Sequence, residues 1–507
     1  MKNVRDDLRT RHVLRELADS ALTRAAGARL VAGNSVRLLK DARQNYPAWL
    51  EAIRGAKHHA HLETYFICED DSGREFADAM IAKAREGVRV RLIYDWLGSF
   101  RKTSRRFWNY LRAAGVEVRC YNPPQFDSPF GWLSRDHRKL IAVDGCVGFI
   151  SGLCIGKMWT GEPELGLEPW RDTGVEVRGP AVADIEQAFA EIWGMIGEPI
   201  PEIEIGKATI ECAGNMDVRI IASLPATAGM IRTDALVAAL ARTRLWLTDA
   251  YFAGTTAYVQ ALRAAAQDGV DVRLLVPNAT DIPMLRPLTR AGYRTLLEAG
   301  VRIFEWNGAM IHAKCAVADE HWARVGSTNL NIASWFGNCE MDVVVENDSF
   351  ARGMQEMYLQ DLSSATEIIL NPKRKVLAAG VPRRPLSALP RSGGSAGRAA
   401  AGAIRVGNAI GAAFTNHRVL EPVEARIMLT TGVWLLAIAV LLAAFPRVWI
   451  YSIAAFLLWL AGTLIYRGCK LRSESKQADH ALIEQRNIGH NPPPVNHHTE
   501  LRPGDGN

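Results

Sequence analysis

One pattern of chemically reactive residues occurs twice in this chain of 507 residues. Each copy has a histidine, a lysine two positions later and an aspartate after four more residues, namely His137, Lys139 and Asp144, then His312, Lys314 and Asp319. A single copy of so short a pattern often arises by chance. Two copies in one chain indicate one shared catalytic centre.

The spacing of histidine and lysine suits chemistry on a phosphate group. Two positions apart on an extended strand, the two side chains project from the same face. Two such strands side by side would surround one phosphate with two imidazoles and two ammonium groups. One neutral imidazole can attack phosphorus, while the other, protonated, gives its proton to the leaving alcohol. The lysines would offset charge on the non-bridging oxygens. This arrangement requires no metal and no cofactor.

The segments around the two copies also repeat. Apolar strand-like segments precede each motif in the same order, at 61–66, 87–93 and 114–118 in the first half and at 245–252, 269–275 and 299–303 in the second. A helical pattern separates the first two segments of each half, at 73–85 and 257–266. An internal duplication of this kind predicts an α/β fold of two pseudo-equivalent lobes, each with a mostly parallel mixed sheet flanked by helices.

Polar residues downstream of the motifs add candidates for the site. Ser327 and Asn329 lie in a short turn where a hydroxyl and an amide could bind phosphate oxygens, and Cys154 stands at the offset of Asn329 in the first half. Asp172 and Glu340 each begin an apolar strand further along. We expect each carboxylate to hold the far ring nitrogen of the histidine in its own half, which fixes the tautomer. The alternative is that both carboxylates only solvate a turn.

Aromatic pairs end the first strand of each half. Tyr65 and Phe66 occupy this position in the first half, and Tyr251 and Phe252 occupy it in the second. They are either walls of the substrate site or ordinary core aromatics.

The doubled motif and the Gly-Ser-x-Asn turn resemble the phospholipase D superfamily. Within it, four segments resemble bacterial cardiolipin synthases of the phospholipase D type, at 61–65, 73–79, 121–124 and 136–139, and the resemblance covers roughly residues 28–370. Cys154 departs from the family, which usually carries asparagine there.

The resemblance implies a phosphatidyltransferase that acts through a covalent phosphatidyl-histidine intermediate, which an incoming alcohol releases. His137 is then the nucleophile and His312 the acid, although the near symmetry of the halves leaves their order open. Phosphatidylglycerol is the implied phospholipid substrate. The alternative reaction is hydrolysis of a phospholipid by a phospholipase D-type phosphodiesterase, with nucleic acid the less favoured substrate.

The charge distribution favours lipid over nucleic acid. Residues 371–507 carry 17 Lys and Arg against 7 Asp and Glu, which leaves 43 against 47 for residues 1–370. A nuclease needs basic surface around its site to neutralise phosphates. We therefore expect no nucleic-acid partner.

The C-terminal third predicts attachment to a membrane. Two apolar runs, 427–445 and 448–466, flank Pro446 and Arg447, and each is long enough as a helix to approach the thickness of the hydrocarbon layer. More basic residues lie outside the runs than between them, so both flanks are expected on the cytoplasmic side. The alternative is a buried hairpin in a soluble core. Nine basic residues in the preceding linker would also be attracted to an anionic leaflet.

The expected order along the chain is an N-terminal helical segment (1–35), a first lobe (36–200), a second lobe (201–370), a basic flexible linker (371–425), a transmembrane hairpin (426–467) and a disordered tail (468–507). Residues 1–29 lack the apolar core of an export signal, and the eight cysteines show no metal-ligand spacing. With the resemblance to bacterial cardiolipin synthases, these features indicate a protein of a bacterial-type inner membrane with its catalytic body on the cytoplasmic face. The oligomeric state is left open.

Overall fold

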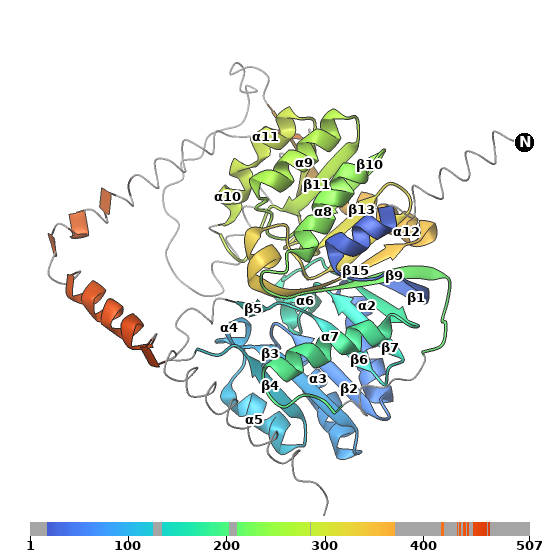
Figure 1. Ribbon diagram of the computed structural model, residues 1–507, viewed down its shortest axis with the longest axis vertical. Coiled ribbons are helices and arrows are strands. Elements are labelled where there is room, and N and C mark those ends of the chain that lie inside the picture. Colours follow the sequence, from blue (N-terminus) through green and yellow to red (C-terminus); the bar gives the residue numbers. More distant parts are fainter. Residues whose placement is uncertain are drawn as a thin grey trace, which may run out of the picture. The chain divides into compact units, whose positions relative to one another are not determined.

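The computed structural model describes residues 18–124, 134–201, 210–283, 285–370 and 417–419, with many of the residues between 433 and 466 (Figure 1). The chain divides into one unit of residues 1–123 and 133–433 and another of 124–132 and 434–507. The first unit contains both copies of the motif.

Seven strands form the sheet of the first lobe, in the order β4-β3-β2-β6-β7-β8-β1. Their bounds are β1 Val31–Lys40, β2 His59–Thr64, β3 Arg89–Asp95, β4 Glu117–Tyr121, β6 Leu140–Val143, β7 Val147–Ser151 and β8 Thr173–Arg178. The strand β1 begins before residue 36, where the first lobe was predicted to start.

The second lobe repeats this order as β12-β11-β10-β13-β14-β15-β9. Its strands are β9 Met216–Ser223, β10 Arg244–Thr248, β11 Asp271–Pro277, β12 Arg302–Trp306, β13 Cys315–Ala318, β14 Trp322–Gly326 and β15 Asn338–Glu346. Two further strands, β16 Ala365–Ile369 and β17 His417–Val419, extend the sheet beyond β12. The first seven strands of each lobe therefore follow the same order, as expected from the internal duplication in the sequence.

The predicted mixed α/β class is confirmed, but parallel pairing covers less of each sheet than predicted. Only β2, β3 and β4, and likewise β10, β11 and β12, pair in parallel within the repeated order. The strands that follow each motif pair antiparallel, and short turns join β6 to β7 and β13 to β14. In the β6–β7 turn both Asp144 (φ 53°) and Gly145 (φ 65°) have left-handed backbone. An Asp-Gly pair between apolar runs is a hairpin signal, and it explains why no crossover helix is needed here.

The helices complete three hydrophobic cores. One core joins the first sheet to α2 Asp41–Gly55, α3 Asp71–Arg85 and α5 Arg105–Ala113, and a second joins the other sheet to α8 Gly229–Leu240, α9 Thr256–Gln267 and α11 Tyr293–Glu298. The third core contains residues of both sheets together with α7 Val182–Met195 and α12 Asp348–Leu362. Because this core draws on both lobes, it fixes one lobe against the other (Figure 1).

Backbone pairing also links the lobes. The strand β1 pairs with β8 at one end of its length and with β9 at the other. The short strand β5 (Arg135–Asp136) runs parallel to the beginning of β15, and Arg171 forms a bridge with Ile311. Each motif is therefore attached to a strand of the opposite lobe.

The predicted membrane hairpin is only partly described. Residues 450–463 are helical. Among the described residues, no helix combines the length and apolar character needed to cross a bilayer. The hairpin segments 426–432 and 446–449, the linker apart from β17, the tail and residues 1–17 lie outside the described residues.

Candidate active site

Residues of both lobes line one cavity of about 530 Å³. Six of the predicted site residues are among them, namely Tyr65, His137, Lys139, Tyr251, His312 and Asn329. The two histidines, 175 positions apart in the numbering, thus face a common space.

Backbone hydrogen bonds across the lobes place the two histidines. The His137 N–H donates to the Cys339 carbonyl (2.9 Å), one residue before Glu340. The His312 N–H donates to the Arg171 carbonyl (2.7 Å), one residue before Asp172. Each histidine therefore lies beside the start of the carboxylate-bearing strand of the other lobe.

The orienting carboxylates follow this crossed arrangement. His137 Nδ1 lies 2.9 Å from Glu340 Oε2, and His312 Nδ1 lies 2.7 Å from Asp172 Oδ2. The prediction that each acid holds the histidine of its own half was wrong, because the strand pairing brings the acid of the opposite lobe to each ring. Both carboxylates are fully buried, so a role in solvating a turn is excluded.

The charge state of these pairs follows from burial and from the partners. Burial opposes ionisation of Asp172 and Glu340, but the charge and hydrogen bond of the partner histidine outweigh it, and the pKa of each carboxyl is lowered. Both are ionised at neutral pH and can only accept hydrogen bonds. The Nδ1–H group of each imidazole must then donate, which leaves each Nε2 as the basic atom.

Burial lowers the pKa of both histidines. The pKa of His312 falls to about 4, because burial and the Lys314 charge outweigh Asp172. The pKa of His137 is also lowered by burial and by Lys139, against the opposing effect of Glu340. Neutral imidazoles with an unprotonated Nε2 are competent nucleophiles near pH 7.

The two lysines complete the cluster. Lys139 Nζ donates to the His137 carbonyl (2.5 Å), and Lys314 Nζ lies 3.0 Å from His312 Nε2. Burial lowers the pKa of Lys314 to about 8. Each lysine also lowers the pKa of the histidine in the other lobe, so the two copies act as one electrostatic unit.

Comparison with known proteins agrees with this geometry. Residues 49–193 and 237–362 match the family described as "Cardiolipin synthase, PLD-like domain". The chain belongs to this family. The cardiolipin synthase of Alkalihalophilus pseudofirmus is 33% identical over 340 residues, which cover 66% of this chain and 67% of that protein. Cardiolipin synthase A of Pseudomonas fluorescens SBW25 is 32% identical over 355 residues, with 68% and 72% covered.

A solved structure shares the fold of this member of the cardiolipin synthase family. The phosphatidylserine synthase of Haemophilus influenzae Rd KW20 superposes with a TM-score of 0.55 at 14% identity, over 69% of this chain and 91% of that chain. The family match and the two cardiolipin synthases confirm the resemblance inferred from the twin motif.

The two acids of this family member have different second partners. Ser327 Oγ donates to Glu340 Oε2 (2.6 Å), whereas Trp159 Nε1 donates to Asp172 Oδ2 (3.0 Å). Gly152 stands at the Ser327 offset, and a Cβ there would lie 2.2 Å from Asp172 Oδ1. Ser327, predicted to bind phosphate, is buried and instead supports the carboxylate that holds His137. The indole of Trp159 takes over this function in the first half, which no spacing in the sequence indicated.

The walls of the cavity are aromatic. The Tyr65 ring lies 5.1 Å from the His137 ring, and the Tyr251 ring lies 5.8 Å from that of His312. The rings of Trp159 and Trp170 each lie 5.6 Å from His312. Phe66 also lines the cavity, but Phe252 packs in the core of the second lobe. Both aromatic residues of the first pair and Tyr251 of the second therefore line the cavity, and Phe252 belongs to the core.

The remaining polar position differs between the halves. Asn329 lines the cavity, and its amide makes one long hydrogen bond to Ser334 Oγ (3.5 Å). Cys154 lines the cavity at the equivalent place. The site thus offers an amide on one side and a thiol on the other.

The aspartates of the two motifs lie away from the cavity. Asp144 follows β6, at the opposite end of the strand from His137, and its carboxylate accepts the N–H groups of Lys57, His58 and His59 at 2.7–2.8 Å. Asp319 similarly accepts the N–H groups of 242–244. The prediction of direct participation in catalysis is corrected for both, because their carboxylates fix the backbone that leads into β2 and β10.

One other cluster of described residues has the composition of a metal site. His59, His61 and Glu186 bring their ligand atoms within 4.8 Å of one another. However, His59 Nε2 already contacts Glu186 Oε1 (2.6 Å), and the Arg91 guanidinium lies 3.4 Å from His61 Nε2. A resident cation beside a metal is repulsive, so these residues form a buried polar cluster of the first lobe.

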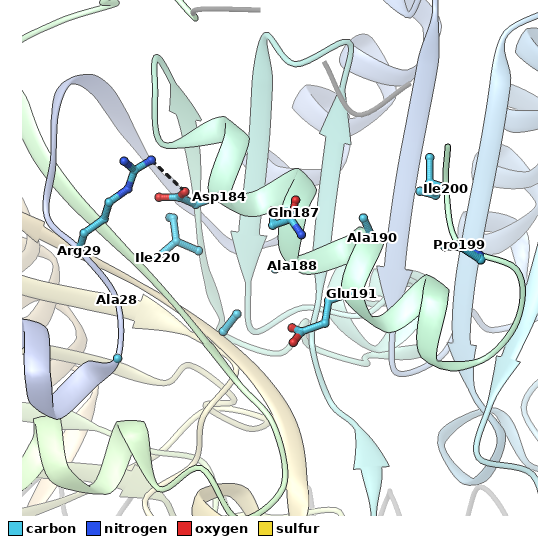
Figure 2. A pocket seen from close by; sticks show the side chains of 12 residues that line it. Ala28, Arg29, Asp184, Gln187, Ala188, Ala190, Glu191, Pro199, Ile200 and Ile220 are labelled. Carbon is cyan, nitrogen blue, oxygen red and sulfur yellow. Dashed lines mark hydrogen bonds and ion pairs between the residues drawn. The ribbon is translucent and has the colours of Figure 1, made fainter. Parts of the chain in front are cut away.

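A second cavity, of about 520 Å³, lies along α7 (Figure 2). Arg29 and Asp184 form an ion pair in its wall (3.4 Å). None of the described residues that line it belongs to the predicted site.

The crossed pairing can be tested by titration. In Glu340→Gln the pKa of His137 should fall further, because the charge that opposes burial is lost, while the pKa of His312 changes much less. Asp172→Asn should do the reverse. NMR titration of histidine-labelled protein, with His137→Ala and His312→Ala used for assignment, measures both. A larger response of His312 than of His137 to Glu340→Gln would show that the acids pair within each lobe.

The aspartate of the motif should matter for stability. Asp144→Asn retains a side chain that tolerates left-handed backbone but loses the charge that accepts three N–H groups. We expect the free energy of unfolding to fall by about 1–2 kcal/mol for this half-exposed carboxylate. Burial opposes its ionisation, but the N–H groups lower its pKa, so the difference should be full above about pH 4 and shrink as the pH falls further. Denaturant unfolding at several pH values measures this.

Proposed function

We propose that this chain is a phosphatidyltransferase that forms cardiolipin from phosphatidylglycerol and a second phospholipid. The observation that supports this proposal most directly is the pair of imidazoles in one cavity, each held at Nδ1 by a buried carboxylate of the opposite lobe. Such a pair supplies a nucleophile and an acid to the same phosphorus atom.

In the first step, His137 Nε2 attacks the phosphorus of the donor phosphatidylglycerol. The P–N bond forms as the bond from phosphorus to the glycerol headgroup oxygen breaks. Protonated His312 gives its Nε2 proton to that oxygen, and free glycerol leaves. The product of this step is phosphatidyl-His137, with His312 neutral.

In the second step, His312 takes the proton from a headgroup hydroxyl of the second phospholipid. The hydroxyl oxygen attacks phosphorus, and the P–N bond breaks. Cardiolipin leaves, and the site returns to its first protonation state. Water in place of the hydroxyl would give phosphatidic acid by the same route, which is the hydrolase alternative.

Electrostatics link substrate binding to proton uptake. Burial and Lys314 keep His312 neutral in the free protein. An anionic phosphodiester next to His312 favours the charged imidazolium, so we propose that the acid gains its proton as the donor binds. Lys139 and Lys314 then stabilise negative charge on the non-bridging oxygens in the transition state. The amide of Asn329 contributes a further donor, and Tyr65 and Tyr251 enclose the headgroup.

We further propose that the catalytic body acts at the cytoplasmic face of a bacterial inner membrane. The support comes from the sequence of 426–467, with its two apolar runs, and from the basic residues of 371–425. A lipid substrate requires such a position, because its acyl chains remain in the bilayer.

The reaction can be tested with the purified full-length chain in mixed micelles that contain labelled phosphatidylglycerol. We expect cardiolipin and free glycerol in equal amounts, and a loss of at least about a thousandfold in His137→Ala, in line with the removal of a nucleophile. A phosphatidyl adduct on His137 should be detectable by mass spectrometry after acid quenching. Phosphatidic acid as the main product would contradict transfer, and unchanged activity in His137→Ala would contradict the proposed centre.

A further inference from the structure

One lysine of the cavity has no part in the twin motif. Lys102 lies in the turn between α4 (Trp96–Ser99) and α5, and it lines the same cavity as the two histidines. Its backbone is held on both sides, because its N–H donates to the Ser99 carbonyl (3.0 Å) and its carbonyl accepts the N–H of Glu69 (3.1 Å). The backbone that carries this exposed side chain beside the cavity is therefore fixed by the fold.

The ammonium group of Lys102 packs over an aromatic ring. It lies 3.4 Å from the centroid of the Phe66 ring, which itself lines the cavity. Among the described residues, no Asp or Glu oxygen forms an ion pair with it. Asp281, which lines the same cavity, accepts a hydrogen bond from Tyr251 OH (2.7 Å), and its charge attracts the ammonium group from beyond ion-pair distance. An aromatic face orients a cation but leaves its charge available to an anion.

Two separate cations thus face one cavity. Lys139 belongs to the histidine cluster, while Lys102 comes from a different turn of the same lobe. The charges of the two lysines act on each other, so each favours an anion nearby. A cavity with two lysines in separate places suits two anionic groups rather than one.

The chemistry of the transfer supplies two such groups. The donor phosphate must lie between His137 and His312, where Lys139 and Lys314 contact it. If the acceptor is a phospholipid, it carries a phosphodiester of its own, only a glycerol unit away from the attacking hydroxyl. We propose that Lys102 binds the phosphate of the acceptor phospholipid and so selects it over water and over simple alcohols. This inference rests on the proposed transferase function.

Competition between two acceptors isolates this role. The full-length protein is incubated in mixed micelles with phosphatidylglycerol and an excess of labelled free glycerol. Transfer to a second phosphatidylglycerol gives cardiolipin, and transfer to glycerol gives labelled phosphatidylglycerol. Both products arise from the same intermediate, so their ratio reports acceptor selection alone.

In Lys102→Met, which keeps the apolar stem over Phe66, the ratio of cardiolipin to labelled phosphatidylglycerol should fall at least tenfold. The rate of labelled product formation should not fall below that of wild type, because the donor step does not use Lys102 and more of the shared intermediate is left for glycerol. Lys102→Arg should restore most of the ratio, since the positive charge returns. Thermal unfolding of each variant verifies that the fold is retained.

Arg101→Met provides the matched control. Arg101 is the exposed neighbour of Lys102 and also lies over an aromatic ring, that of Phe100 (5.6 Å), but it is not among the residues that line the cavity. Its loss removes the same charge from the surface and should leave the product ratio unchanged.

Two results would overturn the proposal. An unchanged ratio in Lys102→Met would show that the lysine does not contact the acceptor, and an equal fall of both products would place it on the donor instead. A wild-type protein that makes neither product would contradict the proposed function itself, before any variant is compared.

Discussion

The structure depends on a reciprocal interaction between buried carboxylates and imidazoles. Each carboxylate lies within hydrogen-bond distance of a ring that belongs to the other half of the chain. A buried carboxylate is costly unless it is paired and hydrogen-bonded. The same hydrogen bonds that stabilise Asp172 and Glu340 in the interior therefore also hold the two rings toward one cavity. Fold stability and the orientation of the reactive atoms share one set of contacts.

The surrounding elements are arranged to support these pairs. The shared core with α7 and α12 fixes the lobes against each other, and the short pairing of β5 with β15 aligns one motif with the opposite acid. Behind the carboxylates, Ser327 and Trp159 donate hydrogen bonds to the same carboxylate oxygen atoms that hold the imidazole rings. Removal of water from this region lowers the pKa of both histidines and of Lys314. Burial thus keeps both rings neutral in the free protein, and in the proposed mechanism His312 gains its proton only when the donor binds.

Local sequence patterns predicted the duplicated lobes and the residues that meet in the cavity, because strand and helix periodicities and the twin motif are all short-range signals. They did not predict which acid holds which ring, since that depends on pairing between segments 203 positions apart in one case and 140 in the other. The role of Asp144 was misread for a different reason. Its place in the motif suggests chemistry, whereas the Asp-Gly pair with Gly145 is a turn signal. Trp159 and Lys102 belong to no repeated pattern and became visible only through their distances to Asp172 and Phe66.

The exchange of orienting groups between the lobes has a consequence for the origin of the chain. A single lobe would hold a histidine without its acid and an acid without its histidine, so an ancestor of half the length could work only as a symmetric pair of identical subunits. Joining two copies in one polypeptide freed each from the need to match the other. Differences such as Gly152 against Ser327, or Cys154 against Asn329, require two separately encoded halves, and they allow the two reactive rings to specialise.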